Sequence, residues 1–227
     1  FIGYFLETKV MPLFYRGKKV ITLSPSSAEE IMREGLTREY PAIVNPGIEF
    51  YNRKRFAKTE KPMVLFLNRV KKYKGVETFL KAAKIFQDKN LKVDFIVAGS
   101  GEDLQECKEF AEKNKLRNVT FLGRISEEKK REFMAKSWAF VNPSMKEGWG
   151  IVNIEANYAG TLSIGSDVGG IQDSIINNKT GLLFPQGDYV ALADKLNLII
   201  SNKQLRENLE LGGLSWAKNF SWDKKAE

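Results

Sequence analysis

The sequence predicts an α/β protein in which helices cover both faces of a parallel β-sheet. Between residues 63 and 184, short continuous apolar segments alternate with amphipathic segments of helical period. This alternation is typical of parallel strands that are connected by helices. The chain of 227 residues is also 43% hydrophobic, so it can bury a sizeable core.

Residues 1–44 have a less regular pattern, in which we expect a helix, a strand, a helix and a strand at 1–18, 19–23, 24–34 and 40–44. The second helix has the clearest signal, because Ser24 followed by Pro25 is typical of a helix start. Asn45-Pro46-Gly47 then interrupts the pattern, and the charged stretch that ends at Pro62 predicts a linker or a domain boundary.

After residue 62 the pattern becomes regular. We expect six strands at 63–67, 93–98, 119–122, 138–141, 161–164 and 181–184. Between them, helices should begin near residues 76, 104, 126, 150 and 171, and further helices should follow at 189–200, at 204–211 and from about 221. Because such sheets bind ligands at the carboxyl ends of their strands, the loops that follow the strands should face one crevice.

Glu147-Gly148-Trp149-Gly150 stands at the start of one of these helices. The two glycines let a ligand approach the backbone closely, and the amides of a helix N-terminus favour an anion such as phosphate. We expect Glu155 to share one apolar face of this helix with Ile151, Val152, Tyr158 and Ala159. A carboxylate in that position needs a partner that donates hydrogen bonds: an amide, a cation or a pair of ligand hydroxyls.

A purely structural interpretation of the same stretch competes with this one. Ser144 and Glu147 have the spacing of a capping box, in which the two side chains satisfy amides at a helix start. Because short motifs match by chance, this segment alone does not establish a ligand site.

The net charge of +8 is concentrated in residues 53–75. This stretch contains a single acid, Glu60, and nine basic residues: Arg53, Lys54, Arg55, Lys58, Lys61, Arg69, Lys71, Lys72 and Lys74. A focused basic patch predicts an anionic ligand nearby, although a solvated basic turn would explain most of these lysines taken singly.

The chain contains one cysteine and no histidine. Cys107 has helical spacing to apolar neighbours, so we expect a small buried residue and neither a disulfide nor a cysteine metal site. The lack of histidine excludes Ser-His-Asp and Cys-His catalysis, and zinc bound by imidazole, within this chain. No apolar stretch approaches the roughly 18 residues that cross a bilayer, and we find no pattern of a secretory signal.

A dinucleotide-binding site is one alternative. Gly99-Ser100-Gly101 follows a strand and precedes a helix, as the G-x-G-x-x-G fingerprint requires. The third small residue of that fingerprint would fall at position 104, where this chain has Leu104. The incomplete motif argues against a dehydrogenase.

Several loops taken together resemble those of the retaining, nucleotide-sugar-dependent glycosyltransferases of family 4. In that family a strand ends in a G-R-L type turn followed by K-G, and here Leu67-Asn68-Arg69-Val70 precedes Lys74-Gly75. Asn68 stands where the family has glycine, a departure that affects how closely the donor can approach. The family's paired glutamates, with seven residues between them, match Glu147 and Glu155.

The resemblance implies a GT-B fold of two Rossmann-like domains, and it assigns roles to individual residues. Arg69 and Lys74 would hold the donor diphosphate and Glu147 would bind the donor sugar, so these three are the expected catalytic residues. Glu155 would accept hydrogen bonds from the ribose hydroxyls. The other donor-binding residues would contact the sugar, phosphate or base: Gly148, Trp149, Gly150, Ile151, Val152, Arg124 and Ile125. No metal or other cofactor is implied, because fixed cations can stabilise the leaving diphosphate.

The match runs from about Lys19 to Asp223 and mainly covers the C-terminal, donor-binding half of that fold. It implies three parts: the end of the acceptor-binding N-terminal domain at 1–44, the Rossmann-like donor domain at 45–212, and the start of a crossing helix at 213–227. The first residue is Phe1 and not methionine, which also suggests a piece of a longer chain. We therefore expect the donor-binding part of a retaining hexosyltransferase that uses a UDP- or GDP-sugar, inactive on its own.

The implied partners are this donor and an acceptor, either a glycan, a lipid-linked molecule or a small molecule, which the absent N-terminal domain would bind. A cytoplasmic protein is expected, with peripheral attachment to the inner face of the cell membrane as an alternative. Three other functions stay open: a non-catalytic nucleotide-sugar-binding module or scaffold, a nucleic-acid binder that uses residues 53–75, and an epimerase or phosphorylase on the same fold. An acid on an apolar helix face argues against the scaffold, and the lack of interleaved aromatics argues against the nucleic-acid binder.

Overall fold

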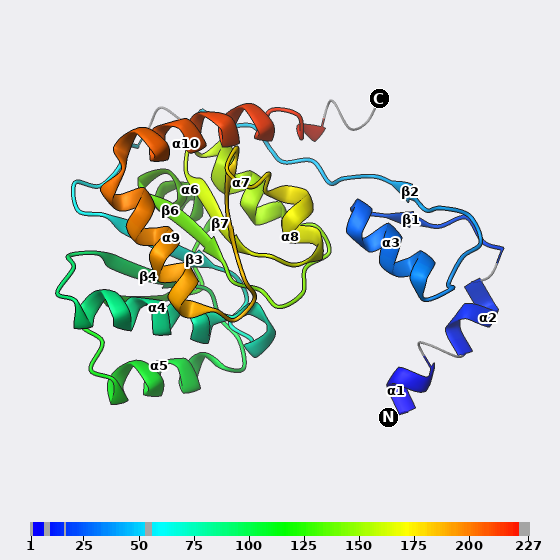
Figure 1. Cartoon of the computed structure of the whole chain (residues 1–227), viewed down its shortest axis with the longest axis horizontal. Coiled ribbons are helices and arrows are strands. Elements are labelled where there is room, and N and C mark those ends of the chain that lie inside the picture. Colours follow the sequence, from blue (N-terminus) through cyan, green and yellow to red (C-terminus); the bar gives the residue numbers. More distant parts are fainter. Residues whose placement is uncertain (1, 7–9, 16, 53–55, 223–227) are drawn as a thin grey trace.

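A six-stranded parallel sheet forms the centre of the larger part of the molecule, and a smaller unit lies beside it (Figure 1). The computed structural model describes residues 2–6, 10–15, 17–52 and 56–222. The predicted fold class, a parallel sheet with helices on both faces, is confirmed.

The strands of this sheet are arranged in the order β5-β4-β3-β6-β7-β8. β3, the first of them in the chain, is central; β4 and β5 are added on one side of it and β6, β7 and β8 on the other. Their bounds are Met63–Leu67 for β3, Asp94–Ala98 for β4, Val119–Gly123 for β5, Ala139–Asn142 for β6, Leu162–Ser166 for β7 and Gly181–Phe184 for β8. The direction of growth reverses between β3 and β6, and such reversals open a crevice at the carboxyl ends of the strands.

Both faces of the sheet are covered, as the side chains of β3 illustrate. Val64 and Phe66 join a core with helices α4, α5, α9 and α10, while Met63 and Leu65 join a second core with α6 and α7. The helix bounds are Val76–Asp88 for α4, Leu104–Lys113 for α5, Glu127–Lys136 for α6, Ile151–Tyr158 for α7, Tyr189–Ser201 for α9 and Lys203–Ala217 for α10. Cys107 is buried in the first of these cores, as predicted.

Two predicted helix boundaries were wrong. α8 spans Gly169–Ser174, so it begins before residue 171, and α10 continues to Ala217 instead of ending at residue 211. Gly212 and Gly213 looked like a helix end, but they serve close packing: a Cβ on Gly212 would lie 2.0 Å from the carbonyl oxygen of Lys179. Both glycines therefore lie inside α10 and do not end it. Residues 223–227, where we expect a further helix, are outside the described part of the chain.

The predicted apolar face of α7 was also partly wrong. Its buried residues are Asn153, Ile154, Ala156, Asn157 and Tyr158, whereas Ile151, Val152 and Glu155 are half-buried. The helix is covered on several sides, because it packs against the sheet and against α10. Asn153 is tolerated there because it joins a buried polar network, in which its Nδ2 donates to Ser174 Oγ at 2.8 Å.

The smaller unit contains α1 (Ile2–Phe5), α2 (Met11–Tyr15), β1 (Ile21–Thr22), α3 (Pro25–Arg33) and β2 (Ala42–Ile43). β1 and β2 pair in parallel, and Ser24 Oγ caps α3 by accepting from the amide of Ser27 at 3.2 Å, as predicted. The helix expected over 1–18 is seen as α1 and α2, and residues 7–9 between them lie outside the described residues. No helix in the described part of the chain has the length and apolar character that a bilayer crossing needs.

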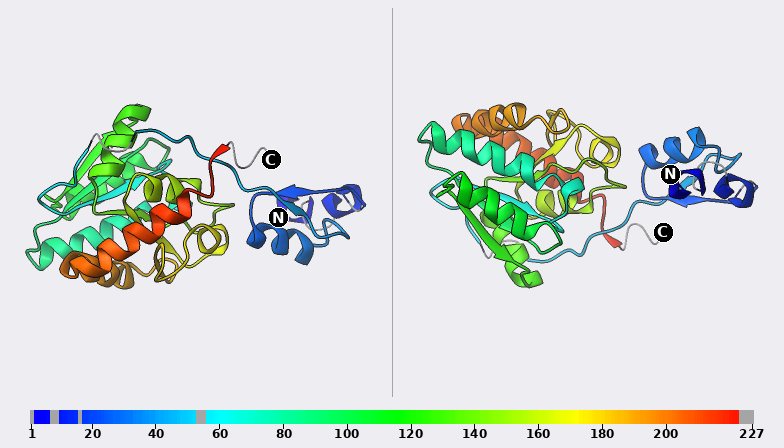
Figure 2. Two further views of the ribbon diagram at one scale, coloured as in Figure 1. Left: turned by 90° about the horizontal axis from the view of Figure 1, so that it is seen from above. Right: turned by 90° about the horizontal axis from the view of Figure 1, so that it is seen from below.

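An extended segment connects the smaller unit to the sheet, and Figure 2 shows that unit at one end of the molecule in two further views. This segment runs beside residues 220–222. The amide of Ile48 donates to the carbonyl oxygen of Phe220 at 2.6 Å, and Ile48 also forms a β-bridge with Ser221. A Cβ on Gly47 would lie 2.8 Å from Trp222 Cα, so the two segments are in close contact.

Lys58, in the same connecting segment, is held against the larger body. Its Nζ donates to Ser137 O and to Thr161 Oγ1, each at 2.5 Å, and lies 3.6 Å from Glu210 Oε1. Burial lowers the pKa of Lys58 from 10.5 to about 8, against the opposing effect of Glu210. Between pH 8 and 10.5 the unfolded chain therefore binds more protons at this site than the folded chain, so its contribution to stability rises with pH in that window.

We expect the free energy of unfolding of the wild type, relative to that of Lys58→Met, to be higher at pH 9.5 than at pH 7.5. The gain should be roughly 1 kcal/mol, less than the full shift would give, because solvent screens a partly exposed ammonium. Urea unfolding at the two pH values measures this difference, and Lys61→Met, which removes a more exposed lysine of the same segment, should behave as wild type. If the free energy of unfolding changed equally with pH in wild type and Lys58→Met, the lowered pKa of Lys58 would be contradicted.

Candidate functional site

The three expected catalytic residues lie in the two loops that flank the reversal point of the sheet. Arg69 and Lys74 follow β3, and Glu147 follows β6. The two loops are joined by a hydrogen bond from the amide of Met145 to the carbonyl oxygen of Tyr73 at 2.7 Å. Gly75 makes their close approach possible: its φ is +71°, and a Cβ there would lie 1.9 Å from the carbonyl oxygen of Pro143.

Lys74 and Glu147 form an ion pair across this junction. Lys74 ends a short 3₁₀ helix, η3 (Lys72–Lys74), and its Nζ lies 2.5 Å from Glu147 Oε2. Only 11% of the Lys74 side chain and 14% of the Glu147 side chain are exposed. Each charge therefore neutralises the other in a poorly solvated position. The pair places a fixed cation and a hydrogen-bond acceptor side by side at the carboxyl ends of the strands.

Helix α7 begins at Ile151, shortly after Glu147, with Gly150 as its N-cap at a φ of +77°. The amides of Ile151 and Val152 belong to its first turn, where N–H groups have no acceptor within the helix. The capping-box interpretation is wrong, because the N-cap of α7 is Gly150 and, among the described residues, no side chain caps this helix. Ser144 Oγ instead donates to Asn142 Oδ1 at 2.7 Å. The helix start is therefore free of side-chain capping by that serine and remains a suitable position for an anion.

Gly148 and Trp149, between Glu147 and this helix, have different surroundings. A Cβ on Gly148 would meet nothing within 4 Å, so this glycine leaves open space. Trp149 is buried, with its ring 5.3 Å from that of Phe220. Trp149 thus anchors the loop in the core, and only its backbone remains a candidate for ligand contact.

Glu155 has the hydrogen-bond donor that its position demanded. Lys130 Nζ, in the first turn of α6, donates to Glu155 Oε1 at 2.9 Å. The partner is a cation, one of the three kinds that the sequence left open. Sequence reasoning did not identify Lys130, because its helix contains several basic residues and no local pattern distinguishes one of them from the others.

The remaining predicted residues lie in the loops that follow β3 and β5. Arg69 is exposed, and its guanidinium has no recorded hydrogen bond or ion pair within the described residues. Arg124 is exposed after β5, whereas Ile125 is half-buried against the core of α6 and α7. Asn68, where the resembling family has glycine, has no positive φ, and its Oδ1 accepts from the amide of Arg69 at 2.9 Å.

The prediction of one basic patch over residues 53–75 was wrong. Lys58 and Lys61 lie at the amino end of β3, and Arg69 and Lys74 lie at its carboxyl end, so the strand separates them. Lys71 and Lys72 are paired with Glu102 and Glu106 of the neighbouring loop and helix, at 2.9 and 3.2 Å. Arg53, Lys54 and Arg55 lie outside the described residues. Among the described basic residues of this stretch, Arg69 and Lys74 thus remain the candidates for the site.

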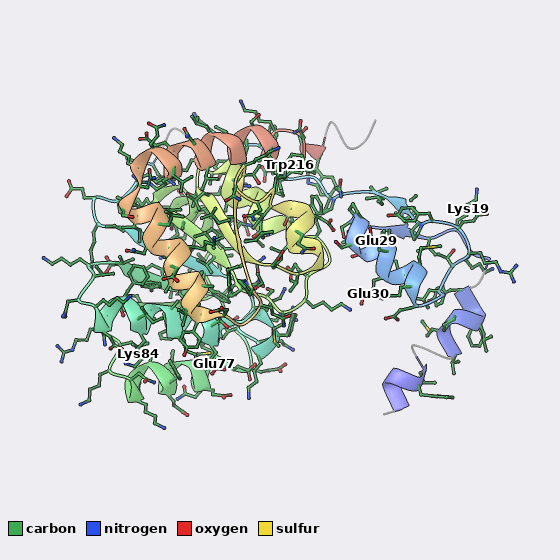
Figure 3. All side chains as sticks on the ribbon, in the orientation of Figure 1. Lys19, Glu29, Glu30, Glu77, Lys84 and Trp216 are labelled. Atoms are coloured by element: carbon green, nitrogen blue, oxygen red, sulfur yellow. The ribbon has the colours of Figure 1, made fainter. Side chains whose placement is uncertain are left out.

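A polar cavity of about 350 Å³ adjoins Glu147 on the side of the smaller unit. Three contacts connect its walls: Ser26 N donates to Asp173 Oδ2 at 3.0 Å, Ser27 Oγ to Gly148 O at 3.2 Å, and Lys146 Nζ to Glu30 Oε1 at 2.6 Å. Figure 3 shows Glu30 on the side of α3 that faces the larger body. The contribution of α3 to the surroundings of Glu147 was not predicted, since no local pattern indicates a contact between residues that lie 121 positions apart in the chain.

Comparison with known proteins agrees with this geometry. The family model described as "Glycosyl transferases group 1" matches residues 47–214. An uncharacterised glycosyltransferase of Methanocaldococcus jannaschii is 31% identical over 160 residues, 70% of this chain and 44% of its own length. The capsular polysaccharide biosynthesis glycosyltransferase CapM of Staphylococcus aureus is 27% identical over 238 residues, 96% of this chain and 61% of its own length. The chain therefore spans less than two thirds of either relative.

Solved structures share the fold. Sucrose-phosphate synthase from Thermosynechococcus elongatus superposes with a TM-score of 0.81 at 26% identity, over 96% of this chain and 58% of that one. HepE of Anabaena, in complex with UDP and glucose, superposes with a TM-score of 0.80 at 18% identity, over 91% of this chain and 60% of that one. These likenesses agree with the predicted GT-B fold. The chain belongs to the group 1 glycosyl transferases.

Proposed function

We propose that this chain is the donor-binding part of a retaining family 4 glycosyltransferase that transfers a hexose from a UDP- or GDP-sugar. The observation that carries the proposal is the Lys74–Glu147 ion pair beside the N-terminus of α7. A cation, a carboxylate and free helix amides in one crevice match the needs of a nucleotide diphosphate joined to a sugar.

Each group has a role in this proposal. Lys74 and Arg69 stabilise the charge that the diphosphate gains as the glycosidic bond breaks, so the transfer needs no metal. Glu147 accepts from the sugar hydroxyls, and Glu155 accepts from the ribose hydroxyls. The amides of Gly148, Trp149, Gly150, Ile151 and Val152 contact sugar and phosphate, and Arg124 and Ile125 flank the base.

The known structures support a nucleotide-sugar donor by analogy. HepE was solved with UDP and glucose, and the pneumococcal GtfA with UDP and GlcNAc. At 18% and 20% identity, these likenesses show the fold alone, so the base and the sugar of this protein's donor belong to the proposal.

The same proposal extends to the whole protein. Residues 1–44 would complete an acceptor-binding domain, 45–212 would bind the donor, and 213–227 would start a crossing helix. The acceptor, a glycan, a lipid-linked molecule or a small molecule, would bind mainly to that first domain, so the fragment alone would not turn over. We place the protein in the cytoplasm, with peripheral membrane attachment as a variant of this proposal.

Calorimetric titration of the chain with UDP, GDP and ADP and their sugar conjugates, without metal, tests the donor site. We expect saturable binding of one nucleotide, weakened by about 10- to 100-fold in Glu155→Ala and in Arg69→Ala, since each removes a charge-assisted contact. Glu112→Ala, which removes an exposed glutamate of α5, is the matched control and should bind as wild type.

Unchanged affinity in both site variants would count against the assignment. A non-catalytic binding module would give the same titration as a transferase. Incubation of the longer parent protein with the identified donor and candidate acceptors separates the two, because only a transferase releases the nucleotide diphosphate as it glycosylates the acceptor.

A further inference from the structure

Lys130 connects the start of α6 to α7, the two parts of the chain at which the nucleoside end of the donor is expected. It lies in the first turn of α6, four residues after Ser126, which caps this helix directly after the loop that contains Arg124 and Ile125. Its Nζ reaches Glu155 Oε1 on α7 at 2.9 Å and Glu127 Oε2 on its own helix at 3.0 Å. Lys130 therefore joins the loop proposed for the base to the carboxylate proposed for the ribose.

The three side chains differ in exposure: 18% for Lys130, 25% for Glu155 and 72% for Glu127. Burial by itself lowers the pKa of Lys130, but the hydrogen bond and charge of Glu155, followed by those of Glu127, outweigh it and raise that pKa. The side chain therefore stays an ammonium ion, held between two carboxylates. Glu155 is held in turn, since Lys130 is its recorded hydrogen-bond donor within the described residues.

We infer that Lys130 positions Glu155 and, together with it, selects nucleotides that carry a ribose. This inference rests on the proposed function, because it assumes that Glu155 faces the ribose. An ammonium ion has three N–H donors, and two of those of Lys130 point to Glu155 and Glu127, which leaves one. A carboxylate accepts about four hydrogen bonds, so Glu155 keeps most of its capacity while Lys130 holds Oε1.

A hydroxyl matches this arrangement because it both donates and accepts. One ribose hydroxyl can donate to Glu155 and accept the remaining N–H of Lys130. A deoxyribose offers no hydroxyl at that position, so one N–H of Lys130 and one acceptor position of Glu155 would stay unsatisfied in a partly buried site. Sites built to bind a hydroxyl reject analogues that lack it for this reason.

The test measures the affinity of the 227-residue chain for UDP or GDP, whichever binds wild type, and for the 2′-deoxy and 3′-deoxy forms of that nucleotide. Wild type should prefer the ribonucleotide over at least one deoxy form by about 10-fold or more. In Lys130→Met this preference should fall to about 3-fold or less, because ribonucleotide affinity drops while deoxynucleotide affinity hardly changes. Lys130→Arg keeps a cation and should restore part of the preference.

Lys129→Met is the matched control, since Lys129 is an exposed neighbour on the same helix, and its preference should equal that of wild type. An unchanged preference in Lys130→Met would overturn the inference and leave the donor site intact. Tighter ribonucleotide binding by Lys130→Met would also overturn it, because Lys130 would then compete with the ribose for Glu155. If wild type bound none of these nucleotides, the proposed function and this inference would fall together.

Discussion

Replacing Lys74 with methionine should weaken nucleotide diphosphate binding by about 100-fold and should also destabilise the fold. The variant loses the cation next to the helix α7 amides, and it leaves Glu147 as a poorly solvated carboxylate without its partner. Removal of one member of a buried ion pair typically costs about 3–5 kcal/mol, and the residual exposure of this pair favours the lower end of that range. Calorimetric titration and urea unfolding measure the two effects.

A second variant separates binding from stability. In Lys74→Met combined with Glu147→Gln, no buried charge remains, so most of the lost stability should return while nucleotide binding stays weak. Lys71→Met is the control from the same loop: Lys71 pairs with Glu102, whose side chain is 75% exposed, so its loss should change stability by less than about 1 kcal/mol. If the double variant regained wild-type affinity, Lys74 would not be a phosphate ligand.

The bounds of the strands could be predicted closely, because a strand that is buried on both faces appears in the sequence as a continuous run of apolar residues. β3 spans Met63–Leu67, as predicted, because its side chains are buried on both faces and the apolar run has no interruption. Helix starts were also readable where a side chain caps them: Ser24 and Ser126 accept from backbone amides of the helices that follow them. The pattern therefore predicted the fold class and the loops that carry the site.

Contacts between distant segments left no such pattern. Lys74 and Glu147 were both expected at the site from the family resemblance, but their direct contact depends on how closely two loops approach. Lys130 lies 25 residues from Glu155 in the chain, and nothing in its charged helix distinguishes it from its exposed neighbours. The burial of Asn153 was equally unreadable, because its partner Ser174 lies on another helix.

The structural roles of the glycines were the hardest to predict from the sequence. A glycine can end a helix, permit a positive φ or make room for another backbone, and only the fold distinguishes these uses. Gly212 lies inside a helix to admit Lys179, whereas Gly150 begins a helix at a φ of +77°. Gly75 combines both demands, because it has a φ of +71° and contacts Pro143. Its substitution should therefore have a large effect.

Gly75→Ala should destabilise the chain by about 2–4 kcal/mol and should weaken nucleotide binding along with it. A Cβ at this position would lie 1.9 Å from the carbonyl oxygen of Pro143 and 2.7 Å from its carbonyl carbon, and backbone atoms cannot rotate away as a side chain does. The loops after β3 and β6 must therefore move apart. Because Lys74 directly precedes Gly75 and Glu147 follows Pro143 in the other loop, the ion pair should lengthen.

Gly187→Ala provides the matched control for the backbone conformation alone. Gly187 has a φ of +76°, but a Cβ there would meet nothing within 4 Å. An alanine at that position should cost about 1–2 kcal/mol and leave nucleotide affinity unchanged. If the two variants lost equal stability and neither lost affinity, close packing at Gly75 would not position the ion pair. A selective loss of affinity in Gly75→Ala would instead show that the approach of these two loops builds the donor site.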